Sequence, residues 1–298
     1  MQGEGNRVAT EITADMVIEV SEVVPRHPAD LTGDLVIDLR PELDDTITES
    51  SRADIADGVD AEAQTVPAAP GPLHGRVAVV TGGANGVGRE VALGLARSGA
   101  RVCVLGRELA QLRETVELAG PEAAILFLQC DVGSLSEIEG VVDFIERFDR
   151  PVDILVHAEG VQVRGGIEHG SVNDLDEQYL VNVRGPYLMS QRLLAQLRAG
   201  RGHVVFVNPA PSSEGAIDFG QFAVTTDSVR SLADTLRREV QTSGVRVTSI
   251  RPEAPTTDVA AETVVALSPH DIADSVLHAV QVPGQVEITD ITLRPRSA

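Results

Sequence analysis

One glycine-rich stretch constrains the fold of this chain more than any other feature. It reads Arg76-Val-Ala-Val-Val-Thr-Gly-Gly-Ala-Asn-Gly-Val-Gly-Arg-Glu-Val91, a short valine-rich run followed by clustered glycines and then by a helical apolar period. We expect Gly82 to allow a sharp bend, and Gly86 and Gly88 to allow close approach of a pyrophosphate and of the strand. The order of these features predicts a strand, a phosphate-binding turn and a helix whose N-terminus faces an anion.

From residue 75 onwards, short apolar runs alternate with amphipathic helical patterns. Strands are expected at 77–80, 101–105, 124–130, 152–156, 203–207, 245–250 and 286–293. Helices are expected after the glycine-rich turn, at 108–118, up to about 148, and at 177–197, 222–241 and 269–280. Helices of this length between strands imply right-handed crossovers. The pattern therefore predicts an α/β fold, a doubly wound Rossmann-type parallel sheet of about seven strands with helices on both faces.

The first 74 residues differ in composition from the rest. Residues 1–45 contain a repeat, Thr13–Val20 echoed by Thr32–Leu39, which predicts two short strands in an acidic N-terminal arm. Residues 46–74 are rich in alanine, aspartate, serine and proline without an apolar period, which predicts a flexible linker to a domain at 75–298. The arm could lie on its own domain, exchange with a neighbouring subunit, or augment a sheet edge of another protein.

Charge and residue usage exclude several functions. The formal net charge is −21, and the first 75 residues hold 16 acidic residues against four arginines. Nucleic acid and membranes are therefore not expected as partners, and the lack of a long apolar run or a signal-peptide pattern predicts a cytoplasmic protein. All 24 residues of the Lys+Arg count are arginine, so any mechanism that needs a lysine ammonium is excluded. Cys103 and Cys130 fall in expected strands, which favours buried thiols over a disulfide, a nucleophile or a metal site.

Several motifs together resemble the short-chain dehydrogenase/reductase (SDR) family. They are Thr81-Gly-x-x-x-Gly-x-Gly88, Cys130-Asp-Val132, Val181-Asn-Val-Arg-Gly185, and the C-terminal segments Leu267–Leu277 and Ile288–Pro295. The resemblance covers residues 75–296. It implies a dinucleotide-binding domain that forms homo- or hetero-oligomers with SDR-like subunits through the helices around Asn182 and Phe222. It places the cofactor against residues spread along the domain, namely Thr81, Gly82, Gly86, Val87, Gly88, Arg107, Asp131, Val132 and Thr257.

Two features of the implied cofactor site bear on its affinity. The second expected strand ends at Arg107, without the acidic residue that would bind an NAD ribose, so NADP(H) is favoured over NAD(H) if either binds. The other interpretation of Arg107 is an exposed charge that precedes a helix. Glu159 and Glu253 replace an alanine and a glycine of the family. A carboxylate about 6 Å from a phosphate would repel it by roughly 3 kcal/mol, so we expect weak or no binding unless Glu159 is protonated or turned outwards.

The implied catalytic positions are the strongest departure from the family. The family reduces carbonyls with a serine, a tyrosine and a lysine four residues after the tyrosine, and the resemblance puts Pro209, Phe222 and Thr226 at these positions. Of the family's four catalytic residues only the asparagine is retained, as Asn182, and both tyrosines of the chain lie on its helix. Phenylalanine cannot donate a proton, and positioned acid–base catalysis contributes about 10²–10⁴ in rate.

Other side chains could support a different chemistry in the same region. His157, Glu159 and Asp218 could converge there, with His157 and Glu159 as an acid–base pair. The alternative is that His157 is a packed strand-end histidine and Glu159 a solvated loop charge.

Three functions follow from these alternatives. The main one is a catalytically degenerate SDR-fold protein that acts through homo- or hetero-oligomeric assembly. The second is an SDR-fold enzyme with non-redox chemistry, such as a cyclase, dehydratase or isomerase. The third is a weak NADP(H)-dependent carbonyl reductase that works through Asn182 and bound water.

Overall fold

The structure is a computed structural model that describes residues 71–209, 216–253 and 267–295. The expected arm at 1–45, the linker as far as residue 70 and Thr257 lie outside the described residues. Residues 71–74, which the sequence assigns to the linker, form a turn that belongs to the folded domain. Leu73 is buried, and its backbone amide donates a hydrogen bond to the Ser98 carbonyl at 2.9 Å.

The centre of the domain is a parallel sheet of seven strands. The strands are β1 Val77–Thr81, β2 Arg101–Gly106, β3 Ile125–Gln129, β4 Ile154–His157, β5 His203–Val207, β6 Arg246–Pro252 and β7 Asp290–Leu293. Their order is β3-β2-β1-β4-β5-β6-β7, and every neighbouring pair is parallel. The predicted Rossmann-type sheet is therefore confirmed. The chain reverses its winding direction between β1 and β4, and such a switch point opens a crevice at the carboxyl ends of the strands.

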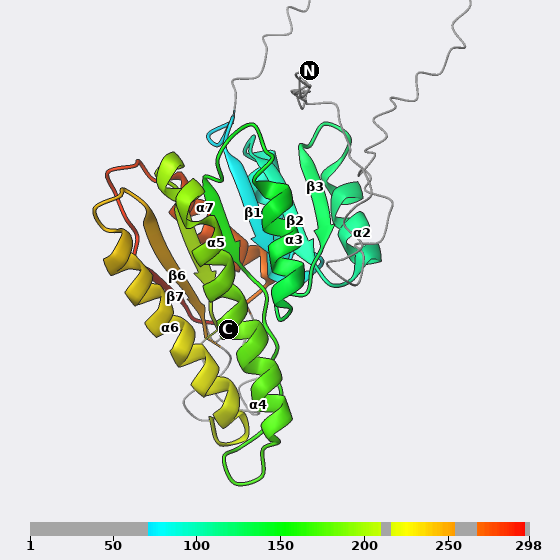
Figure 1. Ribbon diagram of the computed structural model, residues 1–298, viewed down its shortest axis with the longest axis vertical. Helices are drawn as coiled ribbons and strands as arrows, with labels where there is room; N and C mark the ends of the chain where they lie inside the picture. The colour runs from blue at the N-terminus through cyan, green and yellow to red at the C-terminus, as the bar shows by residue number, and fades with distance from the viewer. Residues whose placement is uncertain (1–70, 210–215, 254–266, 296–298) are drawn as a thin grey trace, which may run out of the picture. The chain divides into compact units, whose positions relative to one another are not determined.

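Helices cover both faces of this sheet (Figure 1). They are α1 Gly86–Arg97, α2 Leu109–Ala119, α3 Leu135–Ile145, α4 Val172–Tyr179, α5 Gly185–Gly200, α6 Gly220–Val240 and α7 Pro269–Gln281. On one face α3 packs against α5, and α6 covers β6; on the other face α1 packs against both α2 and α7. Within the described ranges, no helix combines the length and the apolar character needed to cross a membrane.

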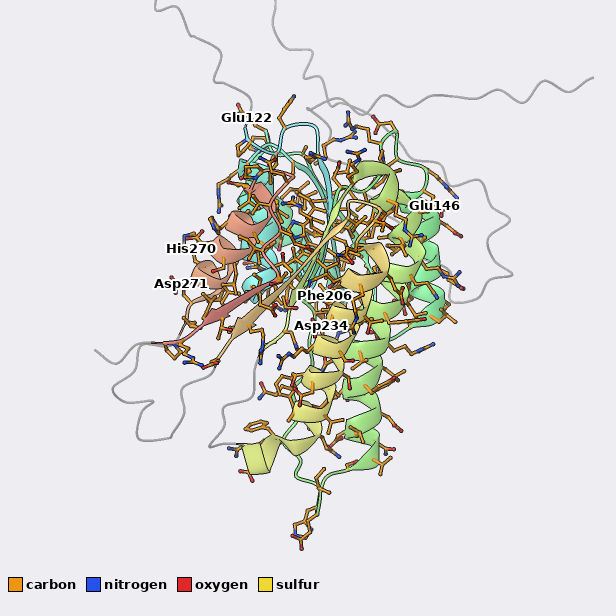
Figure 2. All side chains as sticks on the ribbon, turned by 90° about the vertical axis from the view of Figure 1, so that its left-hand side faces the viewer. Glu122, Glu146, Phe206, Asp234, His270 and Asp271 are labelled. Atoms are coloured by element: carbon orange, nitrogen blue, oxygen red, sulfur yellow. The ribbon has the colours of Figure 1, made fainter. Side chains whose placement is uncertain are left out.

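Alternate strand residues build two apolar layers, one on each face. In β1, Val77 and Val79 join the layer under α3, α5 and α6, whereas Ala78 and Val80 join the layer under α1 and α7. Phe206 of β5 is among the largest fully buried side chains and lies deep in the interior in Figure 2. Burial of each large apolar side chain contributes about 1.5–3 kcal/mol. Because both faces are covered, the strands read as continuous apolar runs in the sequence.

The long helix expected at 177–197 differs in detail from the structure. It begins earlier, with α4, and a π-helical turn at Leu180–Arg184 separates α4 from α5. Pro186 lacks an amide hydrogen, so it cannot donate the α-helical hydrogen bond to the carbonyl of Asn182, four residues earlier. The wider turn that results carries Asn182, in keeping with the frequent occurrence of π-bulges at functional sites.

The last strand is shorter than expected, since β7 begins at Asp290 and not at Val286. The side chain of Glu287 accepts a hydrogen bond from the Val247 amide at 2.8 Å. The Ile288 carbonyl accepts one from the Thr248 hydroxyl. These side-chain contacts take the place of strand pairing along 286–289.

Candidate functional site

A cavity of about 480 Å³ opens at the switch point of the sheet. Its wall is formed by the glycine-rich turn, the segments that follow β2, β4 and β5, the π-helical turn and one face of α6. The cavity brings together these residues singled out from the sequence: Gly82, Val87, Arg107, His157, Glu159, Asn182, Pro209, Phe222 and Thr226.

The remaining candidates lie outside the cavity wall. The Thr81 hydroxyl accepts a hydrogen bond from the Ala158 amide at 3.2 Å and so joins the ends of β1 and β4. Asp131 accepts from the Gly133 amide at 2.8 Å in the turn before α3, and Val132 is buried. Asp218 is exposed and lies 4.0 Å from Arg164, so the structure does not bring it together with His157 and Glu159.

Two glycines make the tight turn possible. Gly82 has φ of +69°, a left-handed conformation that disfavours other residues, and a Cβ there would lie 2.6 Å from the Ala158 carbonyl oxygen. At Gly88 a Cβ would overlap the Gly82 carbonyl. Gly88 therefore serves the packing of α1 on the turn, and neither it nor Gly86 lines the cavity.

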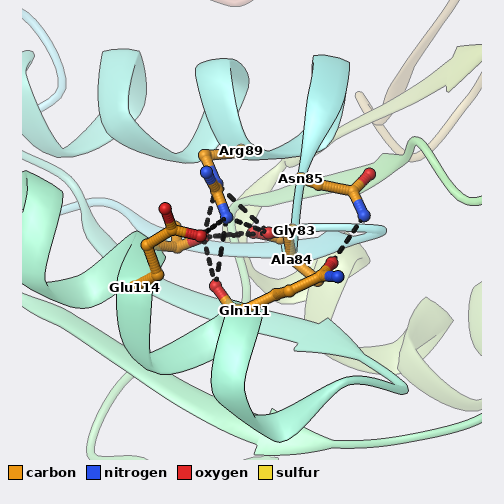
Figure 3. A network of polar contacts seen from close by, with 7 residues as sticks. Gly83, Ala84, Asn85, Arg89, Gln111 and Glu114 are labelled. Carbon is orange, nitrogen blue, oxygen red and sulfur yellow. Dashed lines mark hydrogen bonds and ion pairs between the residues drawn. The ribbon is translucent and has the colours of Figure 1, made fainter.

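A polar network fixes the turn from the side of α2 (Figure 3). The Arg89 guanidinium donates hydrogen bonds to the Ala84 carbonyl at 2.6 Å and to Glu114 at 2.6 Å. The Thr115 hydroxyl donates to the Gly83 carbonyl at 2.9 Å. Sequence reasoning missed this network, although the position of Arg89 directly after Gly88 was an available signal. The network holds the turn in shape through contacts within the protein.

The Asn182 side chain links two segments through hydrogen bonds. Its Oδ1 accepts a hydrogen bond from the Val161 amide at 2.7 Å, and its Nδ2 donates to the Val161 carbonyl at 2.8 Å. Nδ2 also donates to the Thr225 hydroxyl at 3.2 Å. The amide thus holds the loop after β4 against α6, and its donors and one acceptor position are already engaged.

The wall formed by α6 and the end of β5 has little capacity to donate protons. Phe222 is buried in it, and the Thr226 hydroxyl donates to the Ala223 carbonyl at 3.0 Å within its own helix. The Asn208 side chain donates to the Thr226 carbonyl at 2.8 Å, next to Pro209. Among the described residues that line the cavity, none is a tyrosine, serine or lysine.

His157 is a packed, uncharged side chain. Its Nε2 lies 2.9 Å from the Ser190 hydroxyl, and its ring stacks on Phe206 with 4.9 Å between the ring centroids. Burial lowers the pKa of His157 to about 3, so the imidazole is neutral near pH 7. Nδ1 has no hydrogen-bond partner among the described residues. This environment is that of a core histidine and makes His157 a weak base.

Burial in the cavity favours the neutral, protonated form of the Glu159 carboxyl. Burial raises the pKa of its carboxyl to about 7, with Arg107 opposing the shift and Asp131 adding to it. The backbone amide of Gly82 has the weakest influence and also opposes the shift of this pKa, while Oε2 has no hydrogen-bond partner in the described part of the chain. The side chain is therefore not a solvated loop charge. It lies over the turn that the sequence predicts for an anion.

Glu253, the other acidic replacement in the implied cofactor site, does not line the cavity. Its two carboxylate oxygens accept hydrogen bonds from Arg294 at 2.7 and 3.2 Å. An arginine directly after β7 therefore compensates this charge, whereas Glu159 remains in the cavity.

Neither of the two cysteines is placed as a reactive thiol. Cys103 and Cys130 are buried free thiols, and burial raises the pKa of both. No group of three or more His, Cys, Asp or Glu side chains in the described ranges is placed to hold a metal ion.

Comparisons with known proteins agree with this geometry. A family profile described as short chain dehydrogenase matches residues 76–266. An uncharacterized oxidoreductase of Staphylococcus saprophyticus is 29% identical over 230 residues, which cover 75% of this chain and 98% of that protein. Farnesol dehydrogenase of Aedes aegypti is 29% identical over 239 residues, 74% of this chain and 96% of that protein. A match of 29% identity to glycine betaine reductase of Emericella nidulans covers 78% of this chain but only 20% of that protein.

Solved structures give the same result. A metagenomic short-chain oxidoreductase in complex with NADP has a TM-score of 0.68 and 26% identity, and the alignment covers 76% of this chain and 100% of that one. A putative betaketoacyl-ACP reductase has a TM-score of 0.64 and 26% identity, with coverage of 74% and 97%. The profile spans more than half of the residues, and the sheet is parallel with seven strands as expected. The chain therefore belongs to the short-chain dehydrogenase/reductase family.

Proposed function

We propose that this chain is a non-reducing member of the SDR family, one that retains the cavity with weak affinity for NADP(H) and acts through homo- or hetero-oligomeric assembly. The observation that carries the proposal is the position of Phe222. It lies in the cavity wall at the place implied for the tyrosine proton donor, with Thr226 and Pro209 beside the same cavity.

Loss of the proton donor has a large effect on carbonyl reduction. Hydride addition to a carbonyl leaves an alkoxide that must receive a proton, and neither Phe222 nor Pro209 carries one to give. The Thr226 hydroxyl donates within its helix, and no lysine exists in the sequence to lower the pKa of a neighbouring group. Loss of positioned acid–base catalysis alone costs about 10²–10⁴ in rate.

One feature of the cavity favours NADP(H) binding and another opposes it, and we expect weak affinity as the result. Arg107 lines the cavity beside Gln111, where a guanidinium suits a 2′-phosphate. The structural relative with NADP bound makes NADP(H) the more plausible dinucleotide. Glu159 opposes binding, because its carboxyl lies in the same cavity as Gly82 and adds negative charge there when ionised.

The surface of α4, the π-helical turn, α5 and α6 supports the assembly part of the proposal. Tyr179, Leu180, Tyr187 and Val224 are large apolar residues on these elements, and they are 37–50% exposed. Proteins of this family commonly form oligomers, and the resemblance implies an interface through these helices. Contiguous exposed apolar surface is typical of protein interfaces.

A second candidate function is non-redox chemistry, and Glu159 is the observation that favours it. A carboxyl with a pKa of about 7 inside a cavity is suited to proton transfer near neutral pH. His157, which the sequence offers as its acid–base partner, is unsuitable for that role, because burial makes it a very weak base and its Nε2 pairs with the Ser190 hydroxyl. This second function predicts that the chain turns over a small-molecule substrate and that Glu159→Gln abolishes the turnover. Reduction through Asn182 and water has less support, since Val161 and Thr225 already engage the Asn182 amide.

Restoring the family's residues tests the main proposal. We expect Pro209→Ser, Phe222→Tyr and Thr226→Lys together to give little NADPH-dependent reduction of aldehydes and ketones. Adding Glu159→Ala should give measurable turnover, because it removes the carboxyl from the turn. Adding Glu253→Ala instead is the matched control and should not. Reduction by the unmodified chain, at a rate similar to that of the four-substitution variant, would contradict the proposal.

A further inference from the structure

We propose that Glu159 determines which ligand charge this cavity accepts: ionised, its carboxylate repels dinucleotide phosphates from the glycine-rich turn, and protonated, it admits them. The inference rests on the proposed weak affinity for NADP(H) and gives a cause for that weakness above pH 7, where Glu159 ionises. Binding of the anion is then coupled to uptake of one proton by Glu159.

The geometry of the turn supports this assignment. Backbone amides at the N-terminus of a helix that follows a glycine-rich turn form an anion site. Here Glu159 and Gly82 line the same cavity of about 480 Å³, and the two residues are so close that a Cβ on Gly82 would lie 2.9 Å from the Glu159 backbone nitrogen. An internal carboxylate therefore competes with an external phosphate for the same region.

The unpartnered atom of Glu159 is a second, independent observation. Oε2 is buried, and none of the described residues forms a hydrogen bond with it. A buried carboxylate oxygen without a partner is costly, whereas a protonated carboxyl can donate a hydrogen bond from that oxygen. A ligand phosphate in the cavity would be a suitable acceptor for that proton, so the anion stabilises the protonated form.

The charged and titratable groups around Glu159 come from the ends of β2, β3 and β4. Arg107 follows β2 and is the positive group that favours ionisation. Asp131, which follows β3, is negative and disfavours it. The Cys130 thiol adjoins Asp131, and His157 is two residues away on β4; burial keeps both neutral near pH 7. Arg107 is therefore shared between Glu159 and any incoming anion.

The direction of the pH dependence follows from linkage. Burial raises the pKa of Glu159 to about 7, so the free protein becomes increasingly ionised above that pH. A bound phosphate raises this pKa further, because like charges disfavour ionisation. NADPH should therefore bind more weakly as the pH rises from 7 to 9, by between about tenfold and fiftyfold for one linked proton. The phosphates of NADPH are already ionised over this range, since their last pKa is about 6.

Calorimetric titration of NADPH into the full chain at pH 7, 8 and 9, without any carbonyl compound, tests the inference. The parent should lose affinity with rising pH. Glu159→Gln should bind with a constant Kd and at least tenfold more tightly than the parent at pH 9. Repeating the titration at pH 8 in buffers of different ionisation enthalpy should show uptake of close to one proton by the parent and none by Glu159→Gln.

Glu253→Gln is the control, because it removes the same charge from a carboxylate that Arg294 holds outside the cavity. It should keep the pH dependence of the parent. A parent Kd that does not change with pH, or a Glu159→Gln variant that binds no better than the parent at pH 9, overturns the inference. Failure of both proteins to bind NADPH at any of these pH values also overturns it, because another feature would then exclude the dinucleotide. None of these results depends on whether the chain reduces carbonyls.

Discussion

Single residues in this domain show how burial without a charged partner changes ionisation. Glu159 has one buried oxygen without a hydrogen-bond partner in the described residues, and its pKa rises. The histidines His157 and His203 are buried with one nitrogen unpartnered within the described residues, and their pKa values fall. In each case the group with incomplete pairing shifts towards its neutral form.

His203 gives a prediction on stability. Burial lowers its pKa from 6.5 to about 3, with Arg246 adding to the shift. The unfolded chain therefore binds a proton below pH 6.5 that the folded chain does not, so the free energy of unfolding falls as the pH drops. Between pH 8 and pH 5 this linkage amounts to about 2 kcal/mol.

The matched variant is His203→Gln, which keeps a donor for the Thr248 hydroxyl, 2.7 Å from Nε2 in the parent, and cannot titrate. Urea unfolding at pH 8 and pH 5 should show that the parent loses about 2 kcal/mol more than the variant. Equal losses in the two proteins would mean that His203 does not remain neutral in the folded state.

At the scale of elements, the glycine-rich turn and α1 behave as one packed unit. Gly88→Ala places a methyl group against the Gly82 carbonyl and should destabilise the fold by about 1–3 kcal/mol, as overpacking does. Gly140→Ala lies inside α3, where a Cβ meets no atom within 4 Å, and should stabilise by about 0.5–1 kcal/mol.

Denaturant titrations of both variants measure these opposite signs. A Gly88→Ala protein as stable as the parent would show that the turn and α1 can separate at little cost. A destabilised Gly140→Ala protein would contradict the assignment of position 140 to an open helical face.

Much of the element pattern was accessible from the sequence, because parallel strands covered on both faces read as apolar runs. The seven-stranded sheet, the turn around Gly82 and the cavity positions of Phe222 and Thr226 follow from such local signals and from the family resemblance. The π-helical turn was not foreseen, since an apolar period looks continuous through Asn182. The contact between Glu159 and Gly82 joins residues far apart in sequence, and only the pairing of β1 with β4 brings them together.

At the scale of the whole molecule, we expect subunits to assemble through the face formed by α4, α5 and α6. Tyr187 is 48% exposed on α5, and Leu118 is 59% exposed on α2, a helix that packs beside α1 and not among these three. Sedimentation should show an oligomer for the parent and a smaller species for Tyr187→Glu, because a charge at an apolar interface is costly to bury. Leu118→Glu should sediment as the parent does. A monomeric parent, or a Tyr187→Glu protein that sediments as the parent does, would contradict assembly through this face.

We propose that the domain has kept the cavity of its family without the side chains that supply the proton for reduction. Oxidation of NADPH by the unmodified chain at pH 7, followed with a panel of aldehydes and ketones, tests this proposal. We expect no oxidation above the rate in the absence of protein, including at NADPH concentrations that saturate the cavity. Turnover with a kcat of about 1 s⁻¹ or more, within the ordinary range of enzymes, would contradict it.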